Sequence, residues 1–474
     1  MLKKVMLTGV GLAVIGLMRL GFNFVALRAL GEGAAGQLNV ALSLAVLLSL
    51  PATTAFGSTV MRFMGQALAA GERERAAWIY RATLLATLVV ALGVAAVAAA
   101  ARDAIAPAQQ ITPPLVLEAA MVAVGYALYL FLRNVLYAAD RVSAYAVFEV
   151  GGALLFLLAV VALVFAGAGS HLLVAFMVAY VGFGLATLVS TRSLLVLGCP
   201  ADRRPRLLPL LQFSTIASIG TAASLSVREL AVFAAPRIAD LGAAAHLGLS
   251  MSLLAPLQMF PRMLRTVIFS HSAALDGSGR QDELGRSLTE ANHWLALVAV
   301  PACGLVGVLG APLIEVMGGV ATPERLLVFR LLTVAALMEV LATPAANALP
   351  GAGHVKAPNY AAIVALVVTA AIWVLAKGEL GLVGLALGMV VNSIIKGGVS
   401  IWYAWRDLEA RPTRAPGRLA LLLTLTLAVL AAATFWPHGW LLAGLYAVAV
   451  VPLLVAPARE LAALLKTRLG RAAT

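Results

Sequence analysis

The sequence predicts an all-α polytopic membrane protein of about 14 transmembrane helices, with two six-helix lobes in a parallel, pseudo-twofold repeat and two further C-terminal helices. Three observations predict this fold. The 474 residues are 62% hydrophobic and only 12% charged, whereas soluble proteins are roughly 45–50% apolar and about 25% charged. Long apolar runs recur along the whole chain, and patterns from its first half return in its second half. The sequence leaves no room for a soluble catalytic domain, which argues against most enzymes.

A helix needs about 20 mainly apolar residues to cross a bilayer. Fourteen segments meet this requirement: 5–26, 36–58, 79–100, 115–137, 145–167, 171–191, 213–234, 243–267, 291–311, 326–348, 359–376, 380–403, 418–435 and 440–456. An even number of crossings places both ends of the chain on the same side of the membrane.

The basic residues set the orientation, because cytoplasmic loops carry an excess of Lys and Arg. Only Arg28, Arg102, Arg237, Arg325 and Lys377 fall on the predicted outer side, and most of the others fall on the loops of the opposite side. We therefore expect a multi-pass protein of a cytoplasmic membrane with both termini in the cytoplasm. The net charge of +13 then indicates contact with anionic membrane lipids rather than with nucleic acid.

An internal repeat divides the chain. Arg19 and Arg28 recur as Arg228 and Arg237, each 209 residues later, and the Leu30-Gly31 turn resembles Leu241-Gly242. The repeat unit is six spans, so both copies have the same orientation and are related by an axis along the membrane normal. The predicted division is an N-terminal lobe (1–195), a linker (196–206), a C-terminal lobe (207–405) and two accessory helices with a basic tail (406–474).

Polar and charged residues inside the spans are the candidate site, because burying them in a bilayer is costly unless they serve a function. Arg19 lies deep in the first span and Asn23 follows one turn later, while a polar stripe that ends at Arg228 runs along the seventh span. Transporters with parallel repeats bind substrate between the halves. We therefore predict a cationic substrate-binding cavity formed by Arg19, Asn23, Arg228, Ser218, Thr221, Ser224 and Lys396.

Several of these residues also have a structural interpretation. The Ser and Thr residues of the stripe are small and allow close helix packing, and Lys396 is near enough to the inner end of its span to reach the interface. Arg19 could form a structural ion pair with Glu339 or Glu149, and Arg28 and Arg237 fit a positional role at the outer interface.

Glu339 and Glu149 are the candidate groups for ion coupling. Glu339 lies 13 residues into its span, near the midplane, and could either balance an arginine or carry a transported proton. No catalytic residue, metal site or cofactor is predicted apart from a coupling H⁺ or Na⁺. The chain has no P-loop, and its two cysteines, Cys199 and Cys303, lack metal-ligand spacing.

Two segments resemble a known family. The run Arg19-x-Gly-Phe-Asn-Phe-x-x-Leu-Arg28-Ala-Leu-Gly31, followed by Gly57 and Arg62 after the second span, is similar to the opening of O-antigen-type polysaccharide flippases. The segment Arg133-Asn134-x-Leu-x-Ala-Ala-Asp-Arg141 resembles their cytoplasmic turn after the fourth span. These flippases belong to the multidrug/oligosaccharidyl-lipid/polysaccharide (MOP) exporter superfamily. The arginine-rich second-span pattern of lipid II flippases is absent.

The resemblance implies a flippase that moves a polyprenyl-pyrophosphate-linked oligosaccharide to the outer leaflet by alternating access, for export of surface polysaccharide. Its implied partners are this lipid-linked substrate, membrane lipids and other polysaccharide-assembly proteins. One alternative is an H⁺- or Na⁺-coupled drug or cation antiporter of the same fold, which should have a cavity dominated by carboxylates. Another is a membrane-embedded glycan-assembly enzyme or scaffold, which should have large external loops and an acid/base pair.

Overall fold

The computed structural model describes residues 2–200, 204–205, 207–277, 280–354, 356–436 and 439–472, and within these ranges the chain is helical with no strand. Every predicted span coincides with a long helix. These are α1 (Leu2–Val25), α2 (Gly31–Thr59), α4 (Arg73–Ala100), α6 (Pro113–Ala138), α7 (Val142–Phe165), α8 (Leu173–Ser190), α10 (Leu207–Ile238), α11 (Leu241–Gly277), α12 (Gln281–Val308), α14 (Pro323–Gly351), α15 (Lys356–Leu375), α16 (Gly381–Leu408), α17 (Pro416–Phe435) and α18 (Gly439–Ala472).

The helices are long and apolar, as a membrane protein requires. Ten segments of the described chain have the length and hydropathy of membrane spans, and the first of them contains both α1 and α2. Shorter helical segments join the long helices: η1 (Ala26–Leu30), η2 (Val60–Met64), α3 (Gly65–Ala69), α5 (Arg102–Ala108), η3 (Gly169–His171), α9 (Arg192–Val196) and α13 (Gly310–Val316). The chain is a multi-pass membrane protein.

The packing of the helices confirms the parallel repeat. In the first lobe α2 packs on α4 and α6, α1 on α7, and α7 on α8; in the second lobe α11 packs on α12 and α14, α10 on α15, and α15 on α16. Between the lobes, α1 packs on α11 just as α10 packs on α2, and α2 meets α11. A pseudo-twofold axis produces such pairs of contacts, because each helix of one lobe meets the partner that its equivalent in the other lobe meets.

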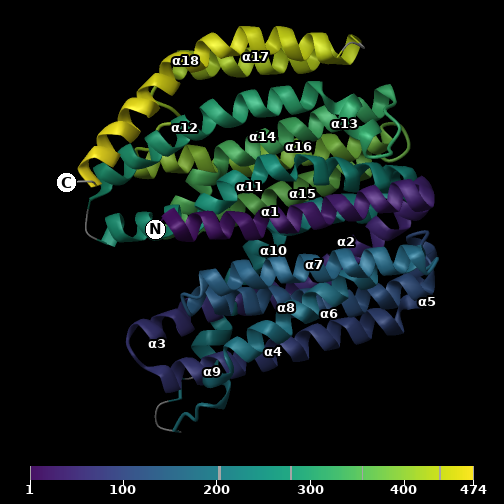
Figure 1. The fold of residues 1–474 in the computed structure, drawn as a ribbon, viewed down its shortest axis with the longest axis vertical. Coiled ribbons are helices and arrows are strands. Elements are labelled where there is room, and N and C mark those ends of the chain that lie inside the picture. Colours follow the sequence, from purple (N-terminus) through teal and green to yellow (C-terminus); the bar gives the residue numbers. More distant parts are fainter. Residues whose placement is uncertain are drawn as a thin grey trace.

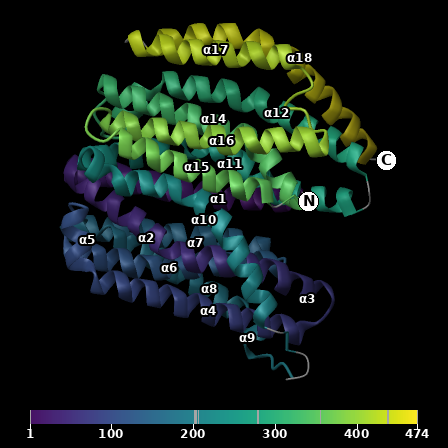
Figure 2. The same ribbon diagram turned by 180° about the vertical axis from the view of Figure 1, so that it is seen from behind.

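Figure 1 shows most of the first lobe, in purple to blue, below the green helices of the second lobe, with the purple α1 lying along the second lobe between the two groups. The yellow helices α17 and α18 lie on the far side of the second lobe. These last two helices pack on α12. Both termini lie at the same end of the bundle, as Figure 2 also shows from behind. We call the opposite end, where α5 and α13 lie, the distal end.

The predicted Leu-Gly turns mark the start of the second helix in each lobe. Gly31 has a φ of 81°, a conformation that glycine adopts readily because it has no Cβ, and it separates η1 from α2. In the second lobe the carboxylate of Asp240 accepts a hydrogen bond of 2.6 Å from the backbone N–H of Ala243, and so caps the first turn of α11.

A buried polar contact lies where α2 crosses α11. The amide of Asn39 fills the space above Gly248, where a Cβ would overlap it, and these two residues are 209 positions apart, as equivalent positions of the repeat are. Asn39 donates a hydrogen bond of 2.8 Å to Asn23, which in turn donates one of 3.0 Å to Ser252 of α11. The lobes therefore meet through specific polar contacts as well as apolar packing.

The distal end holds a second set of contacts between the lobes. Arg28 donates a hydrogen bond of 3.0 Å to the carbonyl of Val316 in the second lobe, and Arg237 donates one of 2.8 Å to the carbonyl of Ala108 in the first. The side chain of Arg325 also makes two hydrogen bonds, of 2.5 and 2.7 Å, to the carboxylate of Glu32. Arg28 and Arg237 therefore have the positional role expected for them, each reaching into the other lobe.

Candidate functional site

The first predicted arginine joins the lobes in the middle of the bundle. Arg19 of α1 donates a hydrogen bond of 3.0 Å from Nη2 to Oε1 of Glu229, which belongs to α10 of the other lobe. The second oxygen of Glu229 accepts a hydrogen bond of 2.9 Å from Ser43 of α2. The carboxylate that balances Arg19 is therefore Glu229, and neither of the expected partners, Glu339 and Glu149, makes this pair.

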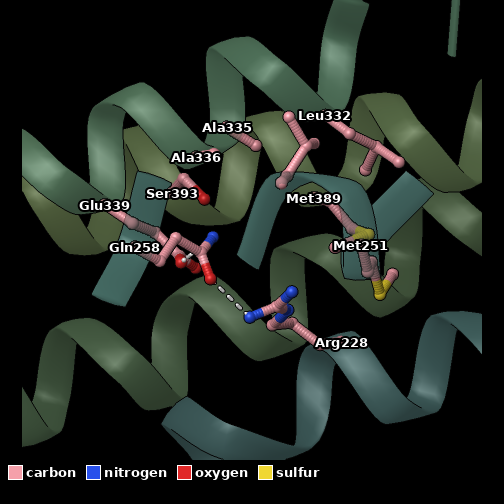
Figure 3. A pocket seen from close by; sticks show the side chains of 10 residues that line it. Arg228, Met251, Gln258, Leu332, Ala335, Ala336, Glu339, Met389 and Ser393 are labelled. Atoms are coloured by element: carbon pink, nitrogen blue, oxygen red, sulfur yellow. Dashed lines mark hydrogen bonds between the residues drawn. The ribbon is translucent and has the colours of Figure 1, made fainter. Parts of the chain in front are cut away.

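The second predicted arginine begins a polar chain inside the second lobe. Arg228 donates a hydrogen bond of 2.6 Å to Gln258 of α11, and Gln258 donates one of 3.1 Å to Glu339 of α14. Glu339 lies 3.8 Å from the ammonium of Lys396 in α16, which in turn donates a hydrogen bond of 3.3 Å to Ser224 of α10. Figure 3 shows Arg228, Gln258 and Glu339 converging from three helices.

This chain of contacts bears on the alternatives for Glu339 and Lys396. Glu339 balances Lys396 directly and contacts Arg228 through a neutral amide, so its contacts are those of a counter-charge. Lys396 has its ammonium between Glu339 and Ser224, with 22% of the side chain exposed. The geometry therefore argues against the alternative in which Lys396 only extends toward the interface.

A small cavity lies beside this chain (Figure 3). It is lined by Arg228, Gln258, Glu339 and Ser393 together with the apolar side chains of Met251 and Met389. Its volume of about 20 Å³ is enough for roughly one water molecule. The cavity can hydrate the polar chain, but it is far too small to hold a lipid-linked sugar.

The other residues of the predicted cavity have separate surroundings. Asn23 is buried at the contact between the lobes, where it bonds to Asn39 and Ser252 rather than facing an open space. Ser218 donates its hydroxyl hydrogen bond to the carbonyl of Thr215 in its own helix. The side chain of Thr221 lies outside the described part of the structure.

The predicted coupling residue Glu149 lies in the other lobe from Glu339. It is buried in α7 and accepts a hydrogen bond of 2.9 Å from the hydroxyl of Tyr129 in α6. Its second oxygen is buried without a hydrogen-bond partner among the described residues. The ring of Tyr180 in α8 stacks on that of Tyr129 with 5.0 Å between the ring centroids, so the carboxylate lies beside an aromatic cluster. The two candidate coupling residues therefore do not form one site.

The cavity predicted from the sequence included neither Glu229 nor Gln258 nor Ser43. Glu229 follows Arg228 directly in the sequence. A carboxylate next to an arginine in the same span was the feature that could have pointed to it. Consecutive Cα atoms are about 3.8 Å apart and consecutive helical side chains point in different directions. Glu229 thus reaches the first lobe while Arg228 reaches into the second, and both predicted arginines are brought to the same turn of α10.

Five charged side chains lie around this turn. Arg19, Arg228 and Lys396 carry three positive charges against the two carboxylates of Glu229 and Glu339, which leaves a net charge of +1. Guanidinium groups bind phosphate oxygens through paired, charge-assisted hydrogen bonds. The side chain of Arg19 is 32% exposed although it lies well inside α1, so it is only partly buried.

No protein-family model and no curated protein matches the sequence. Solved structures share the fold. The structure described as the lipid II flippase MurJ in an inward closed conformation has a TM-score of 0.69 at 12% identity, covering 96% of this chain and 99% of that one. A MOP superfamily transporter from Pyrococcus furiosus, described as having a binding pocket of reverse polarity, has a TM-score of 0.64 at 15% identity and covers 86% of this chain and 95% of its own.

An inward-facing multidrug resistance MATE family transporter of the MOP superfamily has a TM-score of 0.63 at 13% identity, covering 83% of this chain and 98% of that one. At these identities the likeness establishes the fold, which is that of MOP superfamily transporters and flippases. The fold therefore agrees with the resemblance noted in the sequence.

Proposed function

We propose that this protein is a flippase of the MOP superfamily that moves a polyprenyl-pyrophosphate-linked oligosaccharide from the inner to the outer leaflet of the bacterial cytoplasmic membrane, for export of surface polysaccharide. The observation that carries the proposal is the convergence of Arg19 and Arg228, one from each lobe, on one turn of α10. A pyrophosphate is anionic and offers several oxygens to guanidinium groups. The polyprenyl chain would remain in lipid between the lobes.

Alternating access supplies the transport cycle in this proposal. The distal end is held closed by Arg28, Arg237 and the Arg325–Glu32 pair. If both termini are cytoplasmic, as the basic loops predict, the distal end is the outer gate and the substrate enters from the inner leaflet. The contact between Asn39 and Gly248 would then lie between the gate and the binding site, where the lobes pivot.

The extent of the fold likeness supports a flippase. A match over 96% of the chain leaves out only 4%, so it must include most of α17 and α18. The compared transporters cover 83–86% of the chain. The flippase structure is therefore a more complete template for this chain than the structures of these transporters are.

Ion coupling belongs to the same proposal. Glu149 is the better candidate for carrying an H⁺ or Na⁺, because one of its buried oxygens has no hydrogen-bond partner among the described residues, whereas Glu339 already faces Lys396 and Gln258. The antiporter alternative draws on this buried carboxylate and on the fold shared with MATE transporters. Its weakness is that the groups around α10 carry a net positive charge, which disfavours a cationic substrate.

Native mass spectrometry of the full-length protein gently extracted from its host membrane tests the proposal. The wild type should retain a polyprenyl-pyrophosphate glycan, and Arg19→Ala and Arg228→Ala should each lose it. Arg102→Ala is the matched control, because Arg102 is an exposed arginine whose contact is with the adjacent Asp103. Failure to retain such a lipid, or equal retention in all variants, would refute the cationic site and direct attention to cation efflux and Glu149→Gln.

A further inference from the structure

We infer that Glu229 acts as a built-in competitor of the substrate, so that the site selects ligands with at least two negative charges over singly charged lipids. The inference rests on the proposed function, because it assumes that Arg19 and Arg228 receive an anionic lipid headgroup. It assigns to Glu229 a role in specificity rather than in ion coupling.

Glu229 occupies the place that a ligand anion would take. It belongs to the second lobe, yet both of its oxygens are bound by the first lobe, Oε1 by Arg19 at 3.0 Å and Oε2 by Ser43 at 2.9 Å. Only 13% of its side chain is exposed. Arg19 is therefore neutralised by an internal carboxylate until something displaces it.

Arg228 is in a different electrostatic state. Its hydrogen-bond acceptor is the neutral amide of Gln258, and the nearest carboxylate in the chain of contacts, Glu339, is shared with Lys396. The repeat position equivalent to Glu229 is Leu20, so the two arginines do not have equivalent carboxylates. One arginine is open to an anion and the other is occupied.

This asymmetry makes the second negative charge decisive. Any ligand that binds Arg19 displaces Glu229, which then keeps only its hydrogen bond from Ser43 in a poorly hydrated site, and this is unfavourable. A singly charged phosphodiester has one charge, which Arg228 already satisfies, and brings no second charge to offset this penalty at Arg19. A pyrophosphate brings a charge for each arginine, and its second charge replaces that of Glu229 on Arg19. Penalising the wrong ligand with an unpaired charge is a general route to specificity.

The selection is useful because singly charged phospholipids surround the protein in the membrane. Without Glu229, Arg19 would bind any phosphate headgroup, since charge-assisted hydrogen bonds to phosphate do not depend on what lies beyond it. With Glu229, bulk phospholipids and monophosphate-linked lipids bind poorly and lipids with a pyrophosphate bind well.

The test measures the binding of two probes that differ only in the linkage, a polyprenyl-pyrophosphate-linked sugar with two negative charges and a polyprenyl-monophosphate-linked sugar with one, of equal chain length and with the same sugar. Binding to the full-length protein is measured in nanodiscs. We expect the wild type to prefer the pyrophosphate by about tenfold or more, since tenfold corresponds to only 1.4 kcal/mol. Glu229→Gln is nearly isosteric: its carbonyl oxygen can still accept from Arg19, and its NH2 group can donate to the hydroxyl of Ser43. It should bring the preference to within about threefold, mainly through tighter binding of the monophosphate.

Two further variants separate specificity from simple charge and from folding. Glu339→Gln changes the net charge of the site by the same amount but leaves the Arg19–Glu229 pair, so it should retain the preference. Glu229→Asp keeps the negative charge and should keep most of the preference. If Glu229→Asp keeps the preference for pyrophosphate while Glu229→Gln loses it, the negative charge is what matters. A purely structural role of Glu229 would not give this result.

The outcomes distinguish the inference from the proposed function. If the wild type prefers pyrophosphate and Glu229→Gln weakens both probes without changing their ratio, Glu229 only joins the lobes and the inference is wrong while the flippase stands. If Glu229→Gln and Glu339→Gln reduce the preference equally, net charge alone sets it and the inference is also wrong. If the wild type binds neither probe, the proposed function fails, and the inference fails with it.

Discussion

The paired arginines at the distal end offer the most quantitative test of how the lobes are held together. Arg28 and Arg237 are exposed repeat equivalents, and each donates one hydrogen bond to a backbone carbonyl of the other lobe. A hydrogen bond in a protein contributes about 0.5–1.5 kcal/mol net. Replacing both arginines by alanine should therefore cost the closed distal end about 2 kcal/mol, which changes the ratio of closed to open molecules by about 30-fold.

The assay measures the separation of the lobes at this end. Spin labels at Asp103→Cys and Val320→Cys, both exposed in the structure, report on the two lobes in a background without Cys199 and Cys303. In the wild type a short distance should dominate. The double variant should show a second, longer population, and each single variant should give about half of the free-energy change, because the two bonds are separate.

The matched control is Lys377→Ala, which removes an exposed positive charge without removing a hydrogen bond that joins the lobes. It should leave the distance distribution unchanged. If the double variant behaves like this control, the arginine–carbonyl bonds do not hold the gate. Closure then depends on other contacts between the lobes, such as the Arg325–Glu32 pair and the hydrogen bond from Gln110 to the carbonyl of Pro236. If only one of the two arginines matters, the symmetric interpretation is wrong.

Two other contacts give predictions that can be checked by thermal unfolding and binding. Gly248→Ala should lower the Tm, because its Cβ would overlap the amide of Asn39, and adding Asn39→Ala should restore part of the loss by making room. Lys396→Met leaves Glu339 without its counter-charge and should lower the Tm, whereas the double variant Lys396→Met, Glu339→Gln should be more stable than Lys396→Met alone. If a double variant loses as much Tm as the first single variant, or as much as the two single losses added together, the two residues do not interact as described.

The sequence predicted the helices because the bilayer imposes them, and it predicted the repeat because equivalent residues recur at a constant offset. Backbone groups in lipid must bond within their own helix, so an apolar run of sufficient length becomes a helix whatever its neighbours are. Residues 209 positions apart, such as Arg19 and Arg228, lie on helices that occupy equivalent places in the two lobes. The short helices α5 and α13 escaped the prediction because neither is long enough to leave a hydropathy signal, although they supply the carbonyls that Arg237 and Arg28 bind.

The side-chain partners could not be predicted in the same way. Hydropathy places Arg19 at a depth in the membrane, but which carboxylate it meets depends on how α1 is rotated against α10 and on the crossing of the lobes. Gln258 carries no charge, so nothing in the sequence indicated that it would link Arg228 to Glu339. Asn23 shares a face of its helix with Arg19 but is used at the contact between the lobes.

The exact repeat of the arginines and the unequal distribution of their partners together suggest how movement and binding are connected. The contacts of Arg228 all lie within the second lobe, so they can persist when the lobes move as rigid bodies. The contacts of Glu229 with Arg19 and Ser43 cross the boundary and must change in any motion that separates the lobes there. A pyrophosphate that replaces Glu229 on Arg19 would remove one of these contacts and bridge the arginines instead. Substrate binding then alters the interactions that resist the motion, because a ligand can shift a conformational equilibrium only through unequal affinity for the two states.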